Sequence, residues 1–160
     1  MKPTVLLPLF LPLISGYITI NPLQIELHSG KYNLNFTQTN SEGYPDGPSK
    51  QPDQCNLSWL SFTQPATCYK SCEGGTRARI TPGTFKGLDD FSLDVWQDYH
   101  GIGSWLDVHG TARVSTKDLL AGYTCKGNVC EVKKGGRGFR TEEGVVGRDE
   151  GPMPDIPICM

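Results

Sequence analysis

Six cysteines constrain this 160-residue chain more than any other feature. They are Cys55, Cys68, Cys72, Cys125, Cys130 and Cys159. An even number of cysteines behind an export signal normally forms disulfides, because the compartment is oxidising. A metal site is the competing interpretation, but no histidine follows the Cys125/Cys130 pair at the spacing of a zinc finger. The sequence therefore predicts three disulfides, no metal and no cofactor.

The first sixteen residues have the order of features of a secretory signal. Lys2 supplies a positive charge, residues 5–14 are apolar, and Ser15-Gly16 supplies the small residues that signal peptidase needs. A membrane-spanning helix needs ~20 apolar residues, about twice this run, and the two prolines inside it would break such a helix. We therefore expect cleavage after residue 16, secretion without a membrane span, and a single domain over residues 17–160.

The expected mature chain is slightly acidic. The full chain has 15 Lys and Arg against 17 Asp and Glu, and loss of Lys2 with the leader leaves 14 against 17, a net charge of −3. A chain with this balance is a poor candidate for general binding of nucleic acid or anionic membranes. Its 144 residues are enough to bury a core.

Alternation of apolar and polar residues predicts short strands. Residues 31–39 alternate cleanly, as in a strand with one buried face. Residues 91–98 and 104–114 alternate as well, with a Gly-Ile-Gly turn between them. Residues 17–27 contain Pro22, which favours a strand at a sheet edge.

Weaker signals complete the pattern. They predict strands around Trp59, over residues 77–81 and near residue 145, a helical turn over 116–120, and a tail rich in glycine and proline from about residue 134. Many short strands separated by turns predict an all-β fold, a small antiparallel β-sandwich or barrel stapled by three disulfides.

One disulfide is predicted by hairpin geometry. If Gly127-Asn128 is a two-residue turn, Cys125 lies directly opposite Cys130 at a non-hydrogen-bonded position, where Cα atoms are ~4.5 Å apart. This separation suits a disulfide. For the other four cysteines we prefer Cys55–Cys72 and Cys68–Cys159, and the pairing Cys55–Cys68 with Cys72–Cys159 remains open.

Acidic residues and histidines are the candidates for chemistry. They are Asp89, Asp90, Asp94, Asp98, His100, Asp107 and His109. Histidine beside carboxylates suits acid–base catalysis, with Arg113 or Lys117 to bind phosphate, but a solvated sheet face has the same composition. No nucleophile elbow, phosphate loop or dinucleotide fingerprint is present. We expect no catalytic residues and no enzyme.

Surface features suggest binding instead. Trp96 and Trp105 are out of phase with the aliphatic faces of their strands, which predicts a contact surface with Asp107 and His109, unless a second layer covers them. The stretch 133–140 is basic with one aromatic, and suits phosphate groups of nucleic acid or lipid, but the acidic pair after it favours a mixed-charge loop.

Two sequons are candidates for glycosylation. They begin at Asn35 and Asn56, in Asn-Phe-Thr and Asn-Leu-Ser. A sugar on either would place that asparagine at the surface.

Residues 55–133 resemble the Alternaria major-allergen-like family of fungal secreted proteins. The resemblance rests on Cys-Asn-Leu-Ser-Trp at 55–59, then Pro65, Cys72 and a strand over 77–80. It continues with Asp-Phe-Ser-Leu-Asp-Val at 90–95, Val-Ser-Thr-Lys-Asp-Leu at 114–119 and the Cys125/Cys130 pair. The family implies a compact antiparallel β-fold, no established catalytic centre, and roles as allergens, elicitors or effectors at a host surface.

The chain departs from this pattern in Cys68, Cys159 and its long tail. With its cysteines paired internally, we expect a monomer or a non-covalent homodimer. The sequence thus predicts a secreted fungal effector or elicitor that binds a host protein, outside or inside host cells, and modulates immunity or virulence. The alternatives are a small secreted hydrolase acting on RNA or polysaccharide, and a toxin or antimicrobial protein.

Overall fold

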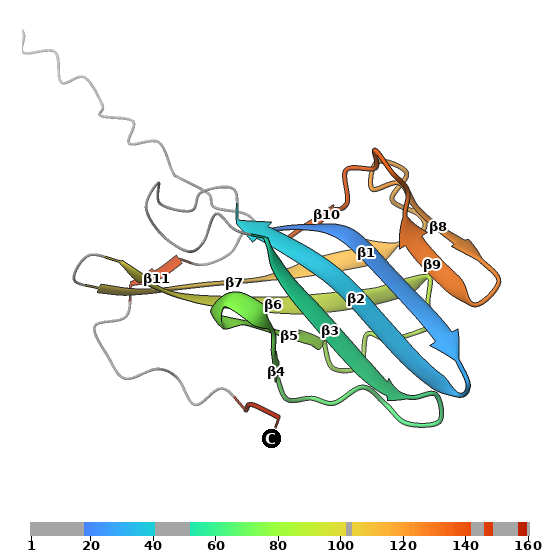
Figure 1. Cartoon of the computed structure of the whole chain (residues 1–160), viewed down its shortest axis with the longest axis horizontal. Helices are drawn as coiled ribbons and strands as arrows, with labels where there is room; N and C mark the ends of the chain where they lie inside the picture. The colour runs from blue at the N-terminus through green and yellow to red at the C-terminus, as the bar shows by residue number, and fades with distance from the viewer. Residues whose placement is uncertain (1–17, 41–51, 102–103, 142–145, 149–156, 160) are drawn as a thin grey trace, which may run out of the picture.

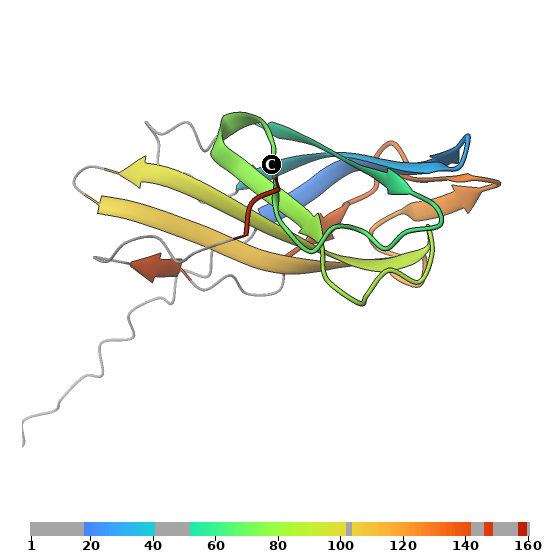
Figure 2. The same ribbon diagram turned by 90° about the horizontal axis from the view of Figure 1, so that it is seen from below.

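The fold is all-β, with two antiparallel sheets that face each other as a sandwich (Figures 1 and 2). The structure is a computed structural model, and it describes residues 18–40, 52–101, 104–141, 146–148 and 157–159. In these residues no helix has the length and apolarity needed to cross a membrane.

The first sheet contains the N-terminal strands and the hairpin closed by a disulfide. Its order is β3-β2-β1-β9-β8, and β10 also pairs with β1. The strands are β1 (Ile18–His28), β2 (Lys31–Asn40), β3 (Asp53–Leu60), β8 (Tyr123–Lys126), β9 (Val129–Val132) and β10 (Phe139–Arg140).

The second sheet contains the long central hairpin. Its order is β11-β7-β6-β5-β4. The strands are β4 (Lys70–Ser71), β5 (Thr76–Ile80), β6 (Asp90–Gly101), β7 (Ser104–Ser115) and β11 (Val146–Arg148), with a short 3-10 turn, η2 (Glu73–Gly75), between β4 and β5.

The prediction that the strand over residues 17–27 lies at a sheet edge is wrong. β1 lies inside the first sheet, between β2 on one side and β9 and β10 on the other. The register of β1 against β2 shifts between Ile20 and Leu23, so Pro22 lies in a bulge. Because a bulged residue makes no ladder hydrogen bond, the missing N–H of proline costs nothing there.

The helical turn expected over residues 116–120 is also wrong. This segment forms turns in which the Asp118 carboxylate accepts hydrogen bonds from the backbone N–H groups of Leu120, at 3.0 Å, and Ala121, at 3.3 Å. Aspartate often bonds the backbone two or three residues ahead in this way, which favours a turn over a helix.

The core lies between the sheets and follows the predicted alternation. Leu34 and Phe36 of β2 point inward, as do Phe91, Leu93 and Val95 of β6. The buried apolar side chains form one cluster that draws on both sheets. At one end of it Tyr32, Trp59 and Phe85 pack with ring centroids 5.1–5.2 Å apart.

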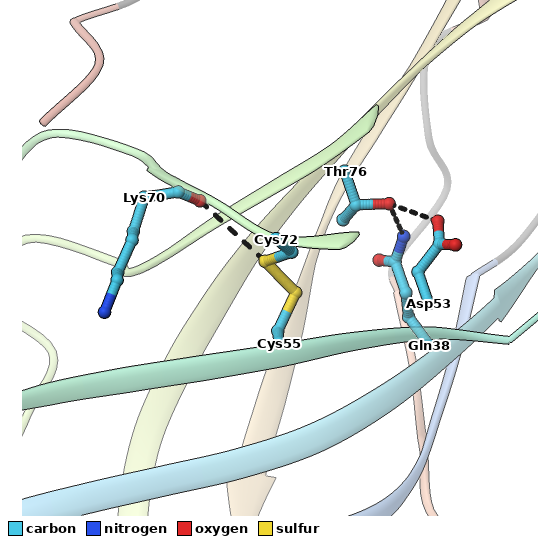
Figure 3. The surroundings of a disulfide bond; sticks show 6 residues. All are labelled: Gln38, Asp53, Cys55, Lys70, Cys72 and Thr76. Atoms are coloured by element: carbon cyan, nitrogen blue, oxygen red, sulfur yellow. Dashed lines mark hydrogen bonds between the residues drawn. A yellow bond between two sulfur atoms is a disulfide. The ribbon is translucent and has the colours of Figure 1, made fainter. Parts of the chain in front are cut away.

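Toward its other end the interior becomes polar. The inward positions of β2, β3 and β5 are there occupied by Gln38, Asp53 and Thr76, all buried (Figure 3). Gln38 donates to the Thr76 hydroxyl, which donates to Asp53 Oδ2 at 2.6 Å. Gly74 in η2 permits this arrangement, because its φ is +69° and a Cβ there would lie 1.9 Å from Asp53 Oδ1.

Three disulfides staple the sandwich, in the pairing that the sequence favoured. Cys125 and Cys130 are register partners across the β8–β9 hairpin, with Cα atoms 4.0 Å apart. Cys55–Cys72 ties β3 to the segment that leads into η2 (Figure 3). Cys68–Cys159 ties the chain before β4 to the C-terminal tail.

Tyr123 makes the stability of the fold sensitive to alkali. Tyr123 is 2 % exposed, and its hydroxyl donates to the backbone carbonyl of Leu88. Burial, with a smaller contribution from Asp89, raises the pKa of Tyr123 far above its usual value of 10. Above pH 10 the unfolded chain therefore loses a proton that the folded chain keeps.

The free energy of unfolding should fall by about 1.4 kcal/mol per pH unit above pH 10 through this tyrosine alone. Urea unfolding between pH 9 and pH 11 measures the slope. Tyr123→Phe should flatten it without abolishing it, because burial also raises the pKa of Tyr69. An equally steep slope in Tyr123→Phe would contradict the assignment.

Candidate functional site

Aromatic side chains gather on the outer face of the second sheet. Trp96 of β6 and His109 of β7 are register partners, and their rings stack with centroids 4.7 Å apart and planes 11° apart. Tyr69, just before β4, meets Trp96 edge-on at 6.4 Å. Trp96 and His109 are half-buried, and Tyr69 is buried. We call Tyr69, Arg79, Trp96 and His109 the aromatic face.

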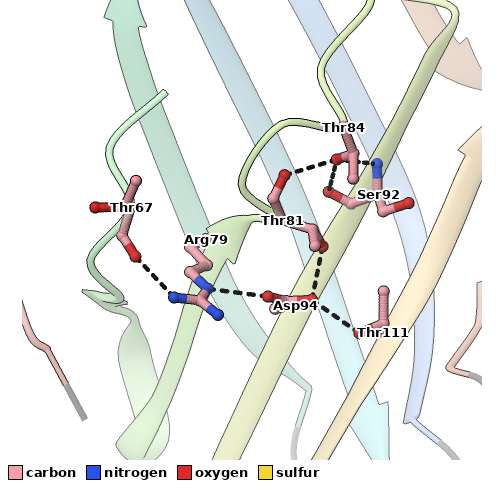
Figure 4. A network of polar contacts seen from close by, with 7 residues as sticks. All are labelled: Thr67, Arg79, Thr81, Thr84, Ser92, Asp94 and Thr111. Carbon is pink, nitrogen blue, oxygen red and sulfur yellow. Dashed lines mark hydrogen bonds and ion pairs between the residues drawn. The ribbon is translucent and has the colours of Figure 1, made fainter. Parts of the chain in front are cut away.

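Asp94 anchors the residues beside this face (Figure 4). Its carboxylate accepts from Arg79 Nε at 2.9 Å, from the Thr81 hydroxyl at 2.6 Å and from the Thr111 hydroxyl at 2.8 Å. Asp94 is 7 % exposed although it points away from the core. Its three partners come from β5, from the segment that follows β5 and from β7, so one carboxylate joins neighbouring parts of the sheet.

Arg79 is held on several sides. Besides its ion pair with Asp94, it donates from Nη1 to the Thr67 carbonyl at 2.8 Å (Figure 4). Its guanidinium carbon also lies 4.3 Å from the centre of the Tyr69 ring, in a cation–π contact. Burial, and then Asp94, raises the pKa of Tyr69 above its usual value, and the smaller opposing effect of Arg79 does not cancel this rise.

The C-terminal tail is clamped to Tyr69. The Tyr69 N–H donates to the Pro157 carbonyl at 2.7 Å, and the Cys159 N–H donates to the Tyr69 carbonyl at 2.9 Å. The Cys68–Cys159 disulfide lies immediately beside these bonds. The preferred Cys68–Cys159 pairing predicted that the tail is tied to this segment, but sequence analysis did not identify Tyr69 as part of a site.

The predicted contact residues divide into two groups. The structure brings Trp96 and His109 together, as a strand pair joined by the predicted turn requires. Backbone pairing places Asp107 opposite Asp98, and Trp105 opposite His100. The side chains of these last four residues lie outside the described part of the structure, so only their register is known.

Two of the carboxylates considered for hydrolysis, Asp90 and Asp94, are engaged in ion pairs. Asp94 has its three partners, and Asp90 accepts from Arg113 and lies 3.7 Å from Lys86 Nζ. The arginine considered for phosphate binding is therefore an ion-pair partner. Within the described residues, no three histidine, cysteine or acidic side chains gather as metal ligands would.

The two sequon asparagines meet on the opposite sheet. Asn35 of β2 and Asn56 of β3 are register partners, both are exposed, and Asn56 Nδ2 donates to Asn35 Oδ1. They line a groove of about 520 Å³ that also contacts Gln24 and the segment Lys70–Glu73. Whether either asparagine carries a sugar stays a prediction.

Comparisons with known proteins add no relative. No protein-family model, curated protein or solved structure matches the chain. The resemblance to the Alternaria allergen-like family stays a prediction, and the functional argument rests on the geometry of the aromatic face.

Proposed function

We propose that this chain is a secreted protein that binds a host macromolecule through its aromatic face, as a fungal effector or elicitor would. The observation that carries the proposal is the stack of Trp96 on His109, both half-buried on the outer face of the second sheet. Tryptophan, tyrosine and arginine are the residues that most often dominate binding energy at interfaces. Three internal disulfides support a location in an oxidising compartment.

The rigidity of the face favours binding. Trp96 is fixed by His109 on one strand and by Tyr69 at its edge. Tyr69 is fixed in turn by Arg79 and by the tail. A surface already held in one arrangement loses little conformational entropy when a partner docks, so more of the contact energy appears as affinity.

The hydrogen bonds of Asp94 argue against a role for it in proton transfer. A general base needs a lone pair within reach of the substrate. Asp94 instead accepts three hydrogen bonds from the protein, one of them from a cation. The same bonds give Asp94 a structural role, because its bond with Arg79 holds the guanidinium group against the Tyr69 ring.

Trp96→Ala should weaken capture of the partner at least about tenfold, since truncation of a central aromatic anchor typically costs about 2 kcal/mol or more and about 1.4 kcal/mol is a factor of ten. The measurement is capture from host extracellular fluid by the immobilised, oxidised chain. Gln54→Ala is the matched control, because Gln54 is exposed on the other sheet.

A partner that Trp96→Ala retains at full strength would contradict the assigned face. The competing hydrolase is tested on the same preparations with RNA and polysaccharide substrates. Turnover by the wild type that His109→Ala abolishes, with unchanged thermal unfolding, would overturn a function based on binding alone.

A further inference from the structure

Two loops at the end of the sandwich that carries the β8–β9 hairpin lie side by side (Figure 1). Residues 116–122 connect β7 to β8, and residues 133–138 connect β9 to β10. The Lys133 N–H donates to the Gly122 carbonyl at 3.0 Å, and the Gly138 N–H donates to the Ala121 carbonyl at 3.2 Å. A Cβ on Gly122 would lie 2.9 Å from the Gly136 Cα, which shows how closely the two loops approach. We call them the double loop.

Two adjacent leucines project from the double loop. Leu119 is 89 % exposed and Leu120 is 67 % exposed. Their turn is fixed by the bonds from Leu120 and Ala121 to the Asp118 carboxylate. Ala121, next in the chain, is buried in the core and anchors the loop. The leucines are thus presented outward by a defined structure.

Both segments of the double loop contain cationic residues. Lys117, Lys133, Lys134 and Arg137 are all exposed. Among the described residues, none of the four has an ion-pair partner. The one acidic side chain of these two segments, Asp118, is bonded to the backbone of its own turn.

We propose that the double loop docks on an anionic lipid surface, with Leu119 and Leu120 in the boundary between headgroups and acyl chains. Exposed single leucines are common on proteins, and exposed lysines are usually solvated. Their combination on one protrusion is what interfacial binding requires, because apolar insertion and attraction to anionic headgroups then act together.

The negative net charge of the whole chain does not oppose the proposal. The chain has a formal charge of −2, but charges separated by more than ~10 Å are largely screened at 0.1 M salt. The excess of cations within the double loop therefore determines its attraction to anionic headgroups.

Nucleic acid is the other polyanion that the basic stretch suits. Phe139, the aromatic that would stack on bases, is only 2 % exposed and packs against Tyr123, so lipid is the better fit.

The test is co-sedimentation of the oxidised full-length mature chain with vesicles of phosphatidylcholine, with and without about 30 % phosphatidylserine. The wild type should sediment only with the anionic vesicles, and less so as salt increases. Leu119→Ser/Leu120→Ser should reduce the partition coefficient about tenfold or more. Lys133→Glu/Lys134→Glu should also reduce it.

Two matched controls isolate the double loop. Phe62→Ser removes an apolar side chain that is 82 % exposed on the loop after β3, and Lys31→Glu reverses an exposed cation at the start of β2. Both should retain vesicle binding. All substituted side chains are exposed, so unchanged thermal unfolding is expected and is checked for each variant.

Failure of the wild type to bind anionic vesicles at low salt would overturn the proposal. So would full binding by Leu119→Ser/Leu120→Ser, because adsorption would then be purely electrostatic. Equal or stronger binding to RNA that depends on the lysines alone would assign the double loop to nucleic acid instead. None of these outcomes affects the proposed role of Trp96, which lies outside the double loop.

Discussion

Replacing both Cys68 and Cys159 by alanine should lower the free energy of unfolding by about 4–5 kcal/mol in the chain-entropy model. This disulfide closes the longest loop of the three, with a sequence separation of 91 residues. Because the entropy lost by the unfolded chain grows with loop length, its removal should exceed the effect of removing either other bridge. Guanidinium unfolding followed by circular dichroism measures the change.

The other two disulfides are internal controls for this result. Cys55–Cys72 has a separation of 17 residues and Cys125–Cys130 one of 5. The same model gives losses of about 3 and about 2 kcal/mol for their double alanine variants. A smaller loss for Cys68→Ala/Cys159→Ala than for Cys125→Ala/Cys130→Ala would show that loop entropy does not control the stability of this fold.

Loss of the Cys68–Cys159 disulfide should also weaken the support of the aromatic face. Cys159 and Pro157 hydrogen bond to the backbone of Tyr69, whose ring contacts both Trp96 and Arg79. Without the covalent link, the tail should detach more readily, because chain termini stay ordered only when something ties them down. Partner capture should therefore weaken in this variant even at temperatures where it remains folded.

Asp94→Ala should cost about 2–3 kcal/mol of stability, somewhat less than the ~3–5 kcal/mol that breaking a fully buried ion pair costs. The substitution leaves Arg79, Thr81 and Thr111 without their shared acceptor. The Arg79 side chain keeps 23 % exposure and its bond to the Thr67 carbonyl, which moderates the loss. Chemical denaturation at neutral pH provides the measurement.

Thr111→Val is the matched comparison for Asp94→Ala. It removes one neutral donor from the same carboxylate and should cost about 1 kcal/mol. Asp94→Asn should fall between the two, because it retains the shape and an acceptor but loses the charge. Equal losses for Asp94→Ala and Thr111→Val would mean that the ion pair with Arg79 contributes nothing measurable.

Local patterns predicted what depends on neighbours in sequence. Alternation placed Leu34 and Phe36 in the core, and turn chemistry aligned Cys125 with Cys130, because side-chain period and hairpin geometry fix these contacts. The position of β1 depended instead on which strands come to flank it. Pro22 favoured an edge, but a bulge removed the reason for that preference.

The candidate site was predictable in part for the same reason. A hairpin between β6 and β7 implies that Trp96 and His109 share a face, and the structure stacks them. The contributions of Tyr69, Arg79 and the tail arise between segments far apart in the chain. Asp94 shows this limit. The alternation of residues 91–98 predicts that Asp94 faces solvent, but contacts with residues from other strands and loops leave it only 7 % exposed.

The polar end of the interior has a consequence for strand alignment. A slip of one residue turns a strand's core side chains outward, but a slip of two preserves the facing of every side chain. Moving β2 by two residues along β3 would place Gln38 opposite Cys55, among apolar side chains, instead of opposite Asp53. Burying that amide without its partners costs roughly 1–3 kcal/mol. Because β2 and β3 change from apolar to polar inward residues along their length, a slip of two residues is disfavoured, although alternation alone would allow it.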